Sequence, residues 1–344
     1  MGQEMPPNAG GPNELGPQLE AALIEACDGR LRDIHWFRTD WQRGGAATGY
    51  AVVTPPEPDR PTTSETGRHA VQCCAARFAE PVEVVIKVPI GPREHRAASK
   101  LFSAGCPQPG IAFSGLELGG YDFAWMVMEK LPGEPMSSDL CKRTFRELME
   151  AGAAFQRAAL ESWPVGPRDP DWEWPEHVAR ARESAHINPI PHAQEWNEQL
   201  KKLERQLERI VTEWRARPTN GWCHGDLHPG NLMRRPEGSP WGDPGCVLLD
   251  FAEVHAGHWV EDAVYVERIY WAKPELMGGA KPVSLLAKAR RELGLSTDDE
   301  YRRVADLRRL LMAGVAPAFI HREGHPLYLD ACLAMVKKLL PAVA

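Results

Sequence analysis

A short polar segment at residues 224–231, HGDLHPGN, concentrates side chains that can do chemistry. Its Pro-Gly step predicts a tight turn. A loop that folds around this turn can direct the side chains of Asp226 and Asn231 into one pocket. Further along the chain, a short apolar run ends at Asp250. Two carboxylates and an amide oxygen are hard ligands of the kind that Mg²⁺ binds beside phosphate oxygens. The pattern therefore indicates phosphoryl transfer.

Phosphoryl transfer needs a metal clamp on the phosphates, a positioned nucleophile and a cation on the triphosphate. We expect Asp226 to be catalytic, because a carboxylate beside the attacking hydroxyl favours loss of its proton. We expect Asn231 and Asp250 to hold Mg²⁺. Lys87 interrupts an apolar strand and would reach the α- and β-phosphates, although such a lysine can also lie on an exposed edge strand. Glu94 is the expected partner that aims this lysine.

The sequence around these residues predicts a β-rich part of the chain, followed by a helical part. Strand-like runs occur at residues 34–36, 50–53, 69–78, 82–88 and 123–131, with short helices expected at 17–27 and 94–104. Helices are expected beyond them at 137–161, 196–214, 299–320 and 326–341. The apolar residues from Trp196 to Trp214 step by three and four, which predicts one continuous amphipathic helix.

The predicted fold class is therefore α+β, with a β-rich N-terminal lobe and a mainly helical C-terminal lobe. We expect a disordered tail over residues 1–16, which are rich in Gly and Pro. The N-terminal nucleotide-binding lobe is expected at residues 17–131. The C-terminal catalytic and acceptor-binding lobe is expected at residues 132–344.

The composition excludes several classes of protein. A formal net charge of −7 argues against a general nucleic-acid binder, which needs clustered Lys and Arg. No apolar run approaches the roughly 20 residues of a membrane-spanning helix, and the first residues do not read as a signal peptide. The 8 cysteines are scattered and Cys73 adjoins Cys74, which favours free thiols in a reducing cytoplasm. We expect no nucleic-acid or membrane partner and a cytoplasmic location.

The motif His-Gly-Asp, four residues and Asn, followed by a strand that ends at Asp250-Phe251, resembles the aminoglycoside phosphotransferase family. The resemblance runs from about Ile34 to Asp262 and implies a bilobal protein-kinase-like fold. It also implies an ATP- and Mg²⁺-dependent phosphotransferase. Such an enzyme moves the γ-phosphoryl group to a hydroxyl of an aminoglycoside-, choline- or homoserine-like small molecule. The resemblance gives Asp262 a structural rather than a catalytic role.

The same resemblance places nucleotide contacts in the N-terminal lobe. Residues 127–133 are similar to the family's hinge, which implies that backbone groups of Glu129 and Leu131 bind adenine. Gly44 and Gly45 would line the phosphates, although a plain hairpin turn explains them as well. The protein-kinase Gly-x-Gly-x-x-Gly pattern is absent from the sequence, and Ala252 stands where protein kinases have Gly. These departures favour a small-molecule kinase over a protein kinase.

Two other functions stay open at this stage. His224, Asp226 and His228, with Cys223, Asp250, His255 and His258 nearby in sequence, could form the metal cluster of a hydrolase. A catalytically silent pseudokinase that only binds ligands is the other alternative. The identity of the acceptor, ATP against GTP, the oligomeric state and the alignment of strands over residues 54–80 also stay open.

Overall fold

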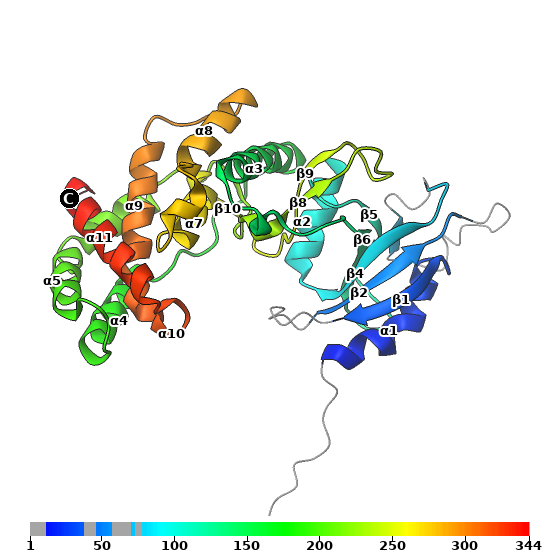
Figure 1. The fold of residues 1–344 in the computed structure, drawn as a ribbon, viewed down its shortest axis with the longest axis horizontal. Helices are drawn as coiled ribbons and strands as arrows, with labels where there is room; N and C mark the ends of the chain where they lie inside the picture. The colour runs from blue at the N-terminus through cyan, green and yellow to red at the C-terminus, as the bar shows by residue number, and fades with distance from the viewer. Residues whose placement is uncertain (1–11, 38–45, 57–69, 73–77, 344) are drawn as a thin grey trace, which may run out of the picture. The chain divides into compact units, whose positions relative to one another are not determined.

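The computed structural model describes residues 12–37, 46–56, 70–72 and 78–343. The chain divides into two compact units. The first comprises residues 1–133 and 233–252, and the second comprises residues 134–232 and 253–344. The first is rich in β-strands and the second is mainly helical, so the predicted α+β fold is confirmed (Figure 1). Residues 233–252, which the sequence-based division assigns to the C-terminal lobe, group with the first unit.

The first unit is built on an antiparallel six-stranded sheet with the strand order β1-β2-β4-β6-β5-β3. Its strands are β1 (Leu31–Phe37), β2 (Ala47–Val53), β3 (Ala70–Gln72), β4 (Val82–Ile90), β5 (Ile111–Gly115) and β6 (Ala124–Glu129). Strand β5 is absent from the sequence-based prediction. Helix α2 (Pro92–Ser103) follows β4 directly. Because β4 lies between β2 and β6, its side chains belong to the centre of the sheet rather than to an edge.

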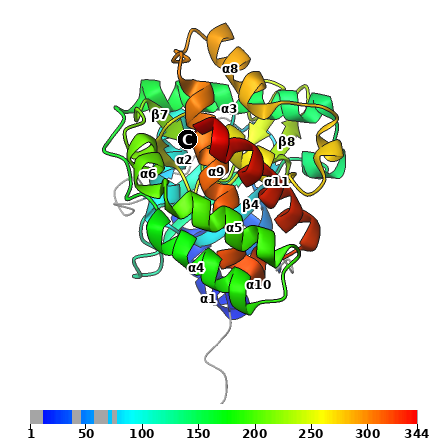
Figure 2. The same ribbon diagram turned by 90° about the vertical axis from the view of Figure 1, so that its left-hand side faces the viewer.

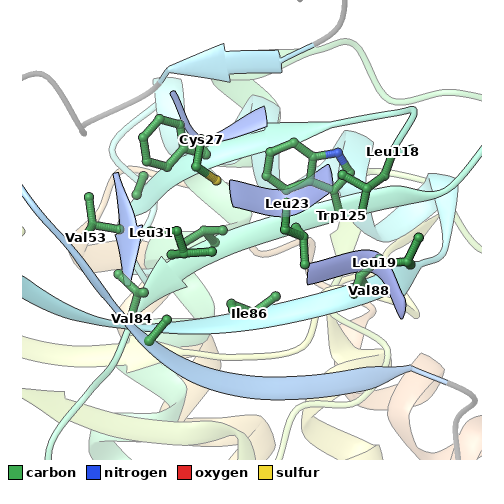
Figure 3. Packing of buried hydrophobic residues seen from close by; sticks show 14 of the residues in the cluster. Leu19, Leu23, Cys27, Leu31, Val53, Val84, Ile86, Val88, Leu118 and Trp125 are labelled. Atoms are coloured by element: carbon green, nitrogen blue, oxygen red, sulfur yellow. The ribbon is translucent and has the colours of Figure 1, made fainter. Parts of the chain in front are cut away.

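Helix α1 (Pro12–Ala26) covers one face of this sheet (Figure 3). Leu23 and Cys27 are completely buried in the same cluster as Ile86 and Val88 of β4 and Trp125 of β6. Burial of each large apolar side chain stabilises the fold by about 1.5–3 kcal/mol. Successive residues of a strand point to opposite faces. Because Ile86 and Val88 point into the core under α1, the residue between them on β4 points to the opposite face of the sheet.

A short two-stranded sheet, separate from the six-stranded one, is formed around residues 233–252. It pairs β8 (Leu232–Arg235) with β9 (Gly245–Leu248). Between these strands, Trp241 packs edge-on against Phe78, with the ring centroids 4.6 Å apart. Gly110 allows the Trp241 ring to lie close to the backbone, because a Cβ atom at residue 110 would lie 2.2 Å from that ring. The position of Asp250 after β9 is thereby tied to the sheet of the first unit.

The second unit is mostly helical (Figure 2). Its helices are α3 (Lys142–Ser162), α4 (Trp174–Ile187), α5 (Ala193–Glu204), α6 (Leu207–Arg215), α7 (Val260–Ile269), α8 (Pro282–Glu292), α9 (Tyr301–Gly314), α10 (Ile320–Glu323) and α11 (Pro326–Val343). Strand β7 (Gly221–Cys223) pairs with β10 (His255–Gly257) in a small antiparallel sheet. None of the helices in the described part of the chain combines the length and hydropathy needed to span a bilayer.

The prediction of one helix from Trp196 to Trp214 is wrong, because two helices cover this stretch. Helix α5 ends at Glu204 and α6 begins at Leu207. Gln206 departs from ideal helical geometry with φ −113° and ψ −1°. The apolar stripe continues across the break, since Leu203 and Leu207 are both buried. A stripe that is shared by two successive helices looks like one helix in the sequence.

Candidate active site

Lys87 lies on the face of β4 opposite the core under α1. Buried and less buried residues alternate along β4, and Ile86 and Val88 on either side of Lys87 are completely buried. Lys87 is paired in register with Thr48 of β2 and Met126 of β6. The reading of Lys87 as a residue of an exposed edge strand is therefore wrong.

Glu94 in the first turn of α2 meets this lysine. The Lys87 Nζ atom lies 2.5 Å from Oε1 of Glu94, as the sequence predicts. Glu94 is 8 % exposed, and this burial raises the pKa of its carboxyl group while the Lys87 charge opposes the rise. The side chain of Lys87 stays 26 % exposed, so its ammonium group is held by Glu94 without being closed off from a ligand.

Asp250 completes this group in the first unit. Its Oδ1 atom lies 3.9 Å from Lys87 Nζ, and its side chain is 44 % exposed. Its backbone has φ +59°, an uncommon value for a residue other than glycine. The N–H of Ala252 donates to Asp250 Oδ1 over 3.4 Å, a local bond of the kind that helps aspartate adopt this conformation. The turn after β9 thus presents the carboxylate beside a cation.

The strand that leads to the expected hinge ends in an ion pair. The Glu129 carboxylate accepts from Arg235 Nη2 over 2.5 Å and from the N–H of Gly110 over 3.0 Å. The N–H of Glu129 donates to the Gly110 carbonyl over 2.8 Å. The N–H and the carboxylate of Glu129 are therefore used within the first unit. Its carbonyl and the backbone of Leu131 are the groups we still expect to contact adenine.

In the second unit, the loop after β7 is fixed at its start by α7. Asp262 accepts the N–H of His224 on Oδ2 and the N–H of Gly225 on Oδ1, both over 3.0 Å. Gly225 has φ +83°, and a Cβ atom there would lie 2.3 Å from the carbonyl oxygen of Glu253. Only glycine combines this backbone conformation with so close an approach. The two residues before Asp226 are thus fixed through their backbone.

The Asp226 carboxylate receives hydrogen bonds on both oxygens. Oδ1 accepts from the Tyr265 hydroxyl over 2.6 Å, and Oδ2 accepts from Asn231 Nδ2 over 3.0 Å. His228 Nε2 lies 3.5 Å from Oδ2. The contacts with His228, Tyr265 and Asn231 hold the pKa of Asp226 well below its usual range, against the effect of burial. Asp226 is therefore a carboxylate at neutral pH, with a fixed orientation.

Asn231 closes the turn on which Asp226 lies. It ends the short 3₁₀ turn Pro229–Asn231, and its Nδ2 atom also donates to the Asp226 carbonyl over 2.9 Å. With the amide nitrogen used in this way, Oδ1 of Asn231 is the atom that points away from Asp226. Within the described residues this oxygen accepts no hydrogen bond. An unused amide oxygen beside a carboxylate suits a hard metal ion.

Comparison with known proteins agrees with this chemistry. Residues 77–307 match the model of the "Phosphotransferase enzyme family" (APH). The chain belongs to this family. It is a small-molecule phosphotransferase, as its motifs predict. A search of curated proteins by sequence finds no match.

Solved structures show the same fold at low sequence identity. The chain is similar to an aminoglycoside phosphotransferase from Alicyclobacillus acidocaldarius, with a TM-score of 0.52, 15% identity and 94% of each chain covered. It is also similar to a microcompartment-associated aminopropanol kinase (TM-score 0.55, 15% identity, 93% of this chain and 98% of that chain). A glucosamine kinase gives a TM-score of 0.53 at 15% identity, with 95% of this chain and 100% of that chain covered.

The sequence-predicted residues of the phosphotransferase fall into two groups. Lys87, Glu94 and Asp250 lie together in the first unit. Asp226 and Asn231 are in direct contact in the second. Gly44 and Gly45 lie outside the described residues. The roles of all these residues stay predictions.

Sequence reasoning missed the side chains that hold Asp226. Tyr265 has no role in the sequence-based prediction, and the sequence indicates only that His228 lies on the loop surface or beside the acceptor site, or is a metal ligand of a hydrolase. The available signal for Tyr265 was its spacing from Asp262, because residues three apart share one face of a helix. His224 is completely buried, and its Nδ1 atom lies 3.4 Å from the N–H of Asp226. This geometry suits a residue that supports the loop.

The hydrolase alternative finds no ligand set in this phosphotransferase. Over residues 12–37, 46–56, 70–72 and 78–343, no three His, Cys, Asp or Glu side chains are grouped as the ligands of a metal ion would be. His258 is buried, and its Nε2 atom lies 2.9 Å from Oδ2 of Asp298. Its Nδ1 atom accepts the N–H of Val260. Both ring nitrogens of His258 are therefore used within the fold.

Proposed function

We propose that this phosphotransferase moves the γ-phosphoryl group of ATP to a hydroxyl group of a small molecule, with Mg²⁺ as the cofactor. The observation that carries the proposal is the Asp226 carboxylate, which is ionised and fixed by three side chains while half-buried in its loop. Lys87, paired with Glu94, supplies the cation that a triphosphate requires. Asp250, beside Lys87, supplies a carboxylate for the metal ion.

In this proposal, Asp226 binds and orients the acceptor hydroxyl. With its pKa lowered, Asp226 is a weak base, so it does not remove the proton before the attack begins. The hydroxyl oxygen forms its bond to the γ-phosphorus as the bond from that phosphorus to the leaving ADP oxygen breaks. The hydroxyl proton passes to Asp226 late in this step, when the oxygen has become more acidic. Orientation rather than strong basicity is the contribution we assign to this carboxylate.

Lys87 would hold the α- and β-phosphates, and Glu94 would keep its ammonium group aimed at them. Asp250 and Oδ1 of Asn231 would hold Mg²⁺, since hard oxygen ligands from one or two side chains are what this ion takes beside phosphates. When bound, the ion would neutralise negative charge on the phosphate oxygens. Backbone groups of Glu129 and Leu131 would bind the adenine ring.

The test measures ADP release from Mg·ATP with a panel of acceptors. Aminopropanol and glucosamine begin the panel, because kinases of the same fold carry these names. An aminoglycoside, choline and homoserine complete it, and Mg·GTP replaces Mg·ATP in a parallel series. We expect D226N to lower kcat by at least about 10³-fold. The thermal shift caused by Mg·AMP-PNP should stay unchanged in this variant.

The other predicted residues separate this function from its alternatives. D250N should reduce the thermal shift by Mg·AMP-PNP, because it removes a proposed metal ligand. An unchanged shift would remove Asp250 from the metal site. Stabilisation by Mg·AMP-PNP without ADP release from any acceptor would instead identify a pseudokinase. Stabilisation by Zn²⁺ alone would identify the hydrolase.

A further inference from the structure

Helix α7 contacts the Asp226 loop at two points. Asp262 accepts backbone N–H groups of the two residues before Asp226, and Tyr265 donates its hydroxyl to Oδ1 of Asp226 over 2.6 Å. Asp262 and Tyr265 are three residues apart, so they lie on the same face of α7. One helix face therefore fixes both the backbone before Asp226 and the Asp226 side chain.

The two carboxylate oxygens of Asp226 differ in what holds them. Oδ2 contacts Asn231 and His228, which belong to the same short loop as Asp226. Oδ1 contacts Tyr265, which comes from a helix 39 residues further along the chain. If the loop shifts, Asn231 and His228 can move with Asp226. Tyr265 is therefore the contact that ties the carboxylate to the rest of the second unit.

The helix that carries Tyr265 is firmly anchored. Ala263, Val264 and Val266 are at most 1 % exposed. Asp262 at its start is 1 % exposed and accepts a hydrogen bond from Gln156 of α3 over 3.3 Å. Close packing on these residues leaves α7 little freedom to move. The Tyr265 hydroxyl therefore provides a fixed reference point for the carboxylate.

We propose that Tyr265 is a positioning residue for phosphoryl transfer, which fixes the rotation of the Asp226 carboxylate so that Oδ1 is aimed at the acceptor hydroxyl. This inference rests on the proposed function of Asp226. The torsion that turns a carboxylate about its Cβ–Cγ bond has broad minima and sets no single orientation by itself. The Tyr265 hydroxyl uses one lone pair of Oδ1 and leaves the other for the acceptor.

The substitution Tyr265→Phe removes only the hydroxyl and keeps the ring. We expect kcat for ADP release from Mg·ATP to fall by about 10–100-fold, since small errors in orientation are costly in transfer reactions. KM for Mg·ATP should stay within about twofold, because nucleotide contacts are not changed. Measurements use aminopropanol and glucosamine as acceptors, and water alone. Circular dichroism checks that the variant is folded.

Tyr270→Phe is the matched control. Tyr270 lies at the end of the same helix, is 9 % exposed, and packs its ring edge-on against Phe145 at 5.1 Å. Its hydroxyl bonds to no residue in the described part of the chain. The same chemical change there should leave kcat and KM unchanged. An equal loss in both variants would mean that packing of α7 explains the effect, and would overturn the inference.

A double-mutant cycle with D226N tests whether Tyr265 acts through Asp226. In single turnovers followed to completion, Tyr265→Phe should slow ADP release in the wild-type background and have no further effect in D226N. The same factor in both backgrounds would overturn the inference. Wild-type rates in Tyr265→Phe with a slow D226N would overturn this inference alone. Equal rates for wild type and D226N would overturn the proposed function and this inference with it.

Discussion

Arg290 donates from Nη1 to Oε1 of Gln156 over 2.6 Å in the interior of the second unit. Gln156 is completely buried, and its Nε2 atom donates onward to Oδ2 of Asp262 over 3.3 Å. The amide thus joins a buried guanidinium to the carboxylate that holds the backbone of the Asp226 loop. Its orientation is settled by its partners, because its oxygen must face a donor and its nitrogen an acceptor.

Replacing Gln156 by leucine should destabilise the protein, because it removes the acceptor of the buried Arg290 Nη1 atom and one of the hydrogen bonds that Asp262 accepts. We expect a loss of about 2–4 kcal/mol in the free energy of unfolding, measured by urea denaturation. Gln194→Leu is the control, since Gln194 is exposed on α5. That variant should change the free energy by less than about 0.5 kcal/mol. Similar losses in both variants would refute the role of Gln156.

Alanine at Gly225 should cost more stability than alanine at other glycines with positive φ. The strain of φ alone is measured at Gly279, which has φ +75° and no atom within 4 Å of the place that a Cβ atom would occupy. We expect about 1 kcal/mol for Gly279→Ala. Gly225→Ala adds a clash with the Glu253 backbone and should cost about 3 kcal/mol or more. Thermal unfolding of the two variants under the same conditions checks the difference.

Lys87→Met should weaken binding of Mg·AMP-PNP by at least about tenfold, because the proposed contact to the phosphates is lost. Glu94→Gln should have a smaller effect, since Lys87 keeps its charge and loses only the ion pair that orients its side chain. Isothermal titration calorimetry measures both affinities. Lys100→Met serves as the control, because Lys100 is exposed in the last turn of α2. Full affinity in Lys87→Met would exclude Lys87 from the nucleotide site.

The stability of the second unit should depend on the protonation of His258. Burial lowers the pKa of His258 below its ordinary value, partly opposed by the Asp298 carboxylate. In the unfolded chain this histidine takes up a proton near pH 6.5. Between that pH and the lowered pKa, the unfolded state binds more protons than the folded state. The free energy of unfolding should therefore fall as the pH drops through this window, by at most about 1.4 kcal/mol per pH unit.

His258→Gln should reduce this slope, because glutamine does not titrate. Urea denaturation at a series of pH values from about 7 to 5 measures it. His186→Gln is the matched control, since His186 is exposed on α4. If the slope in His258→Gln equals that of the wild type, another group must account for the pH dependence.

Much of the first unit could be predicted from its sequence, because the signals there are local. The apolar run of β4 marked a strand, and the spacing from Lys87 to Glu94 matched a strand followed by a helix start. Strand β5 was missed. It has only five residues, and Pro107, Pro109 and Gly110 just before it indicate a loop.

The support around Asp226 could not be predicted in the same way. A tyrosine in a helix is usually a packing residue. The spacing of Tyr265 from Asp262 places both on one helix face, but it does not identify a contact with a residue 39 positions away. Arg290 lies on α8, a helix that the sequence pattern did not predict. Contacts of this kind depend on how the helices pack together. Local periodicity contains no information about that packing.

The first unit is discontinuous along the chain, and this has a consequence for its synthesis. A nascent chain that has reached residue 133 contains Glu129 but not Arg235, the guanidinium that neutralises its buried carboxylate. At typical rates of translation, roughly 6–24 s pass before residue 252 is made. Co-translational folding of the first unit therefore has to wait for β8, Trp241 and β9. The unit whose synthesis begins first can complete its folding only after much of the second has left the ribosome.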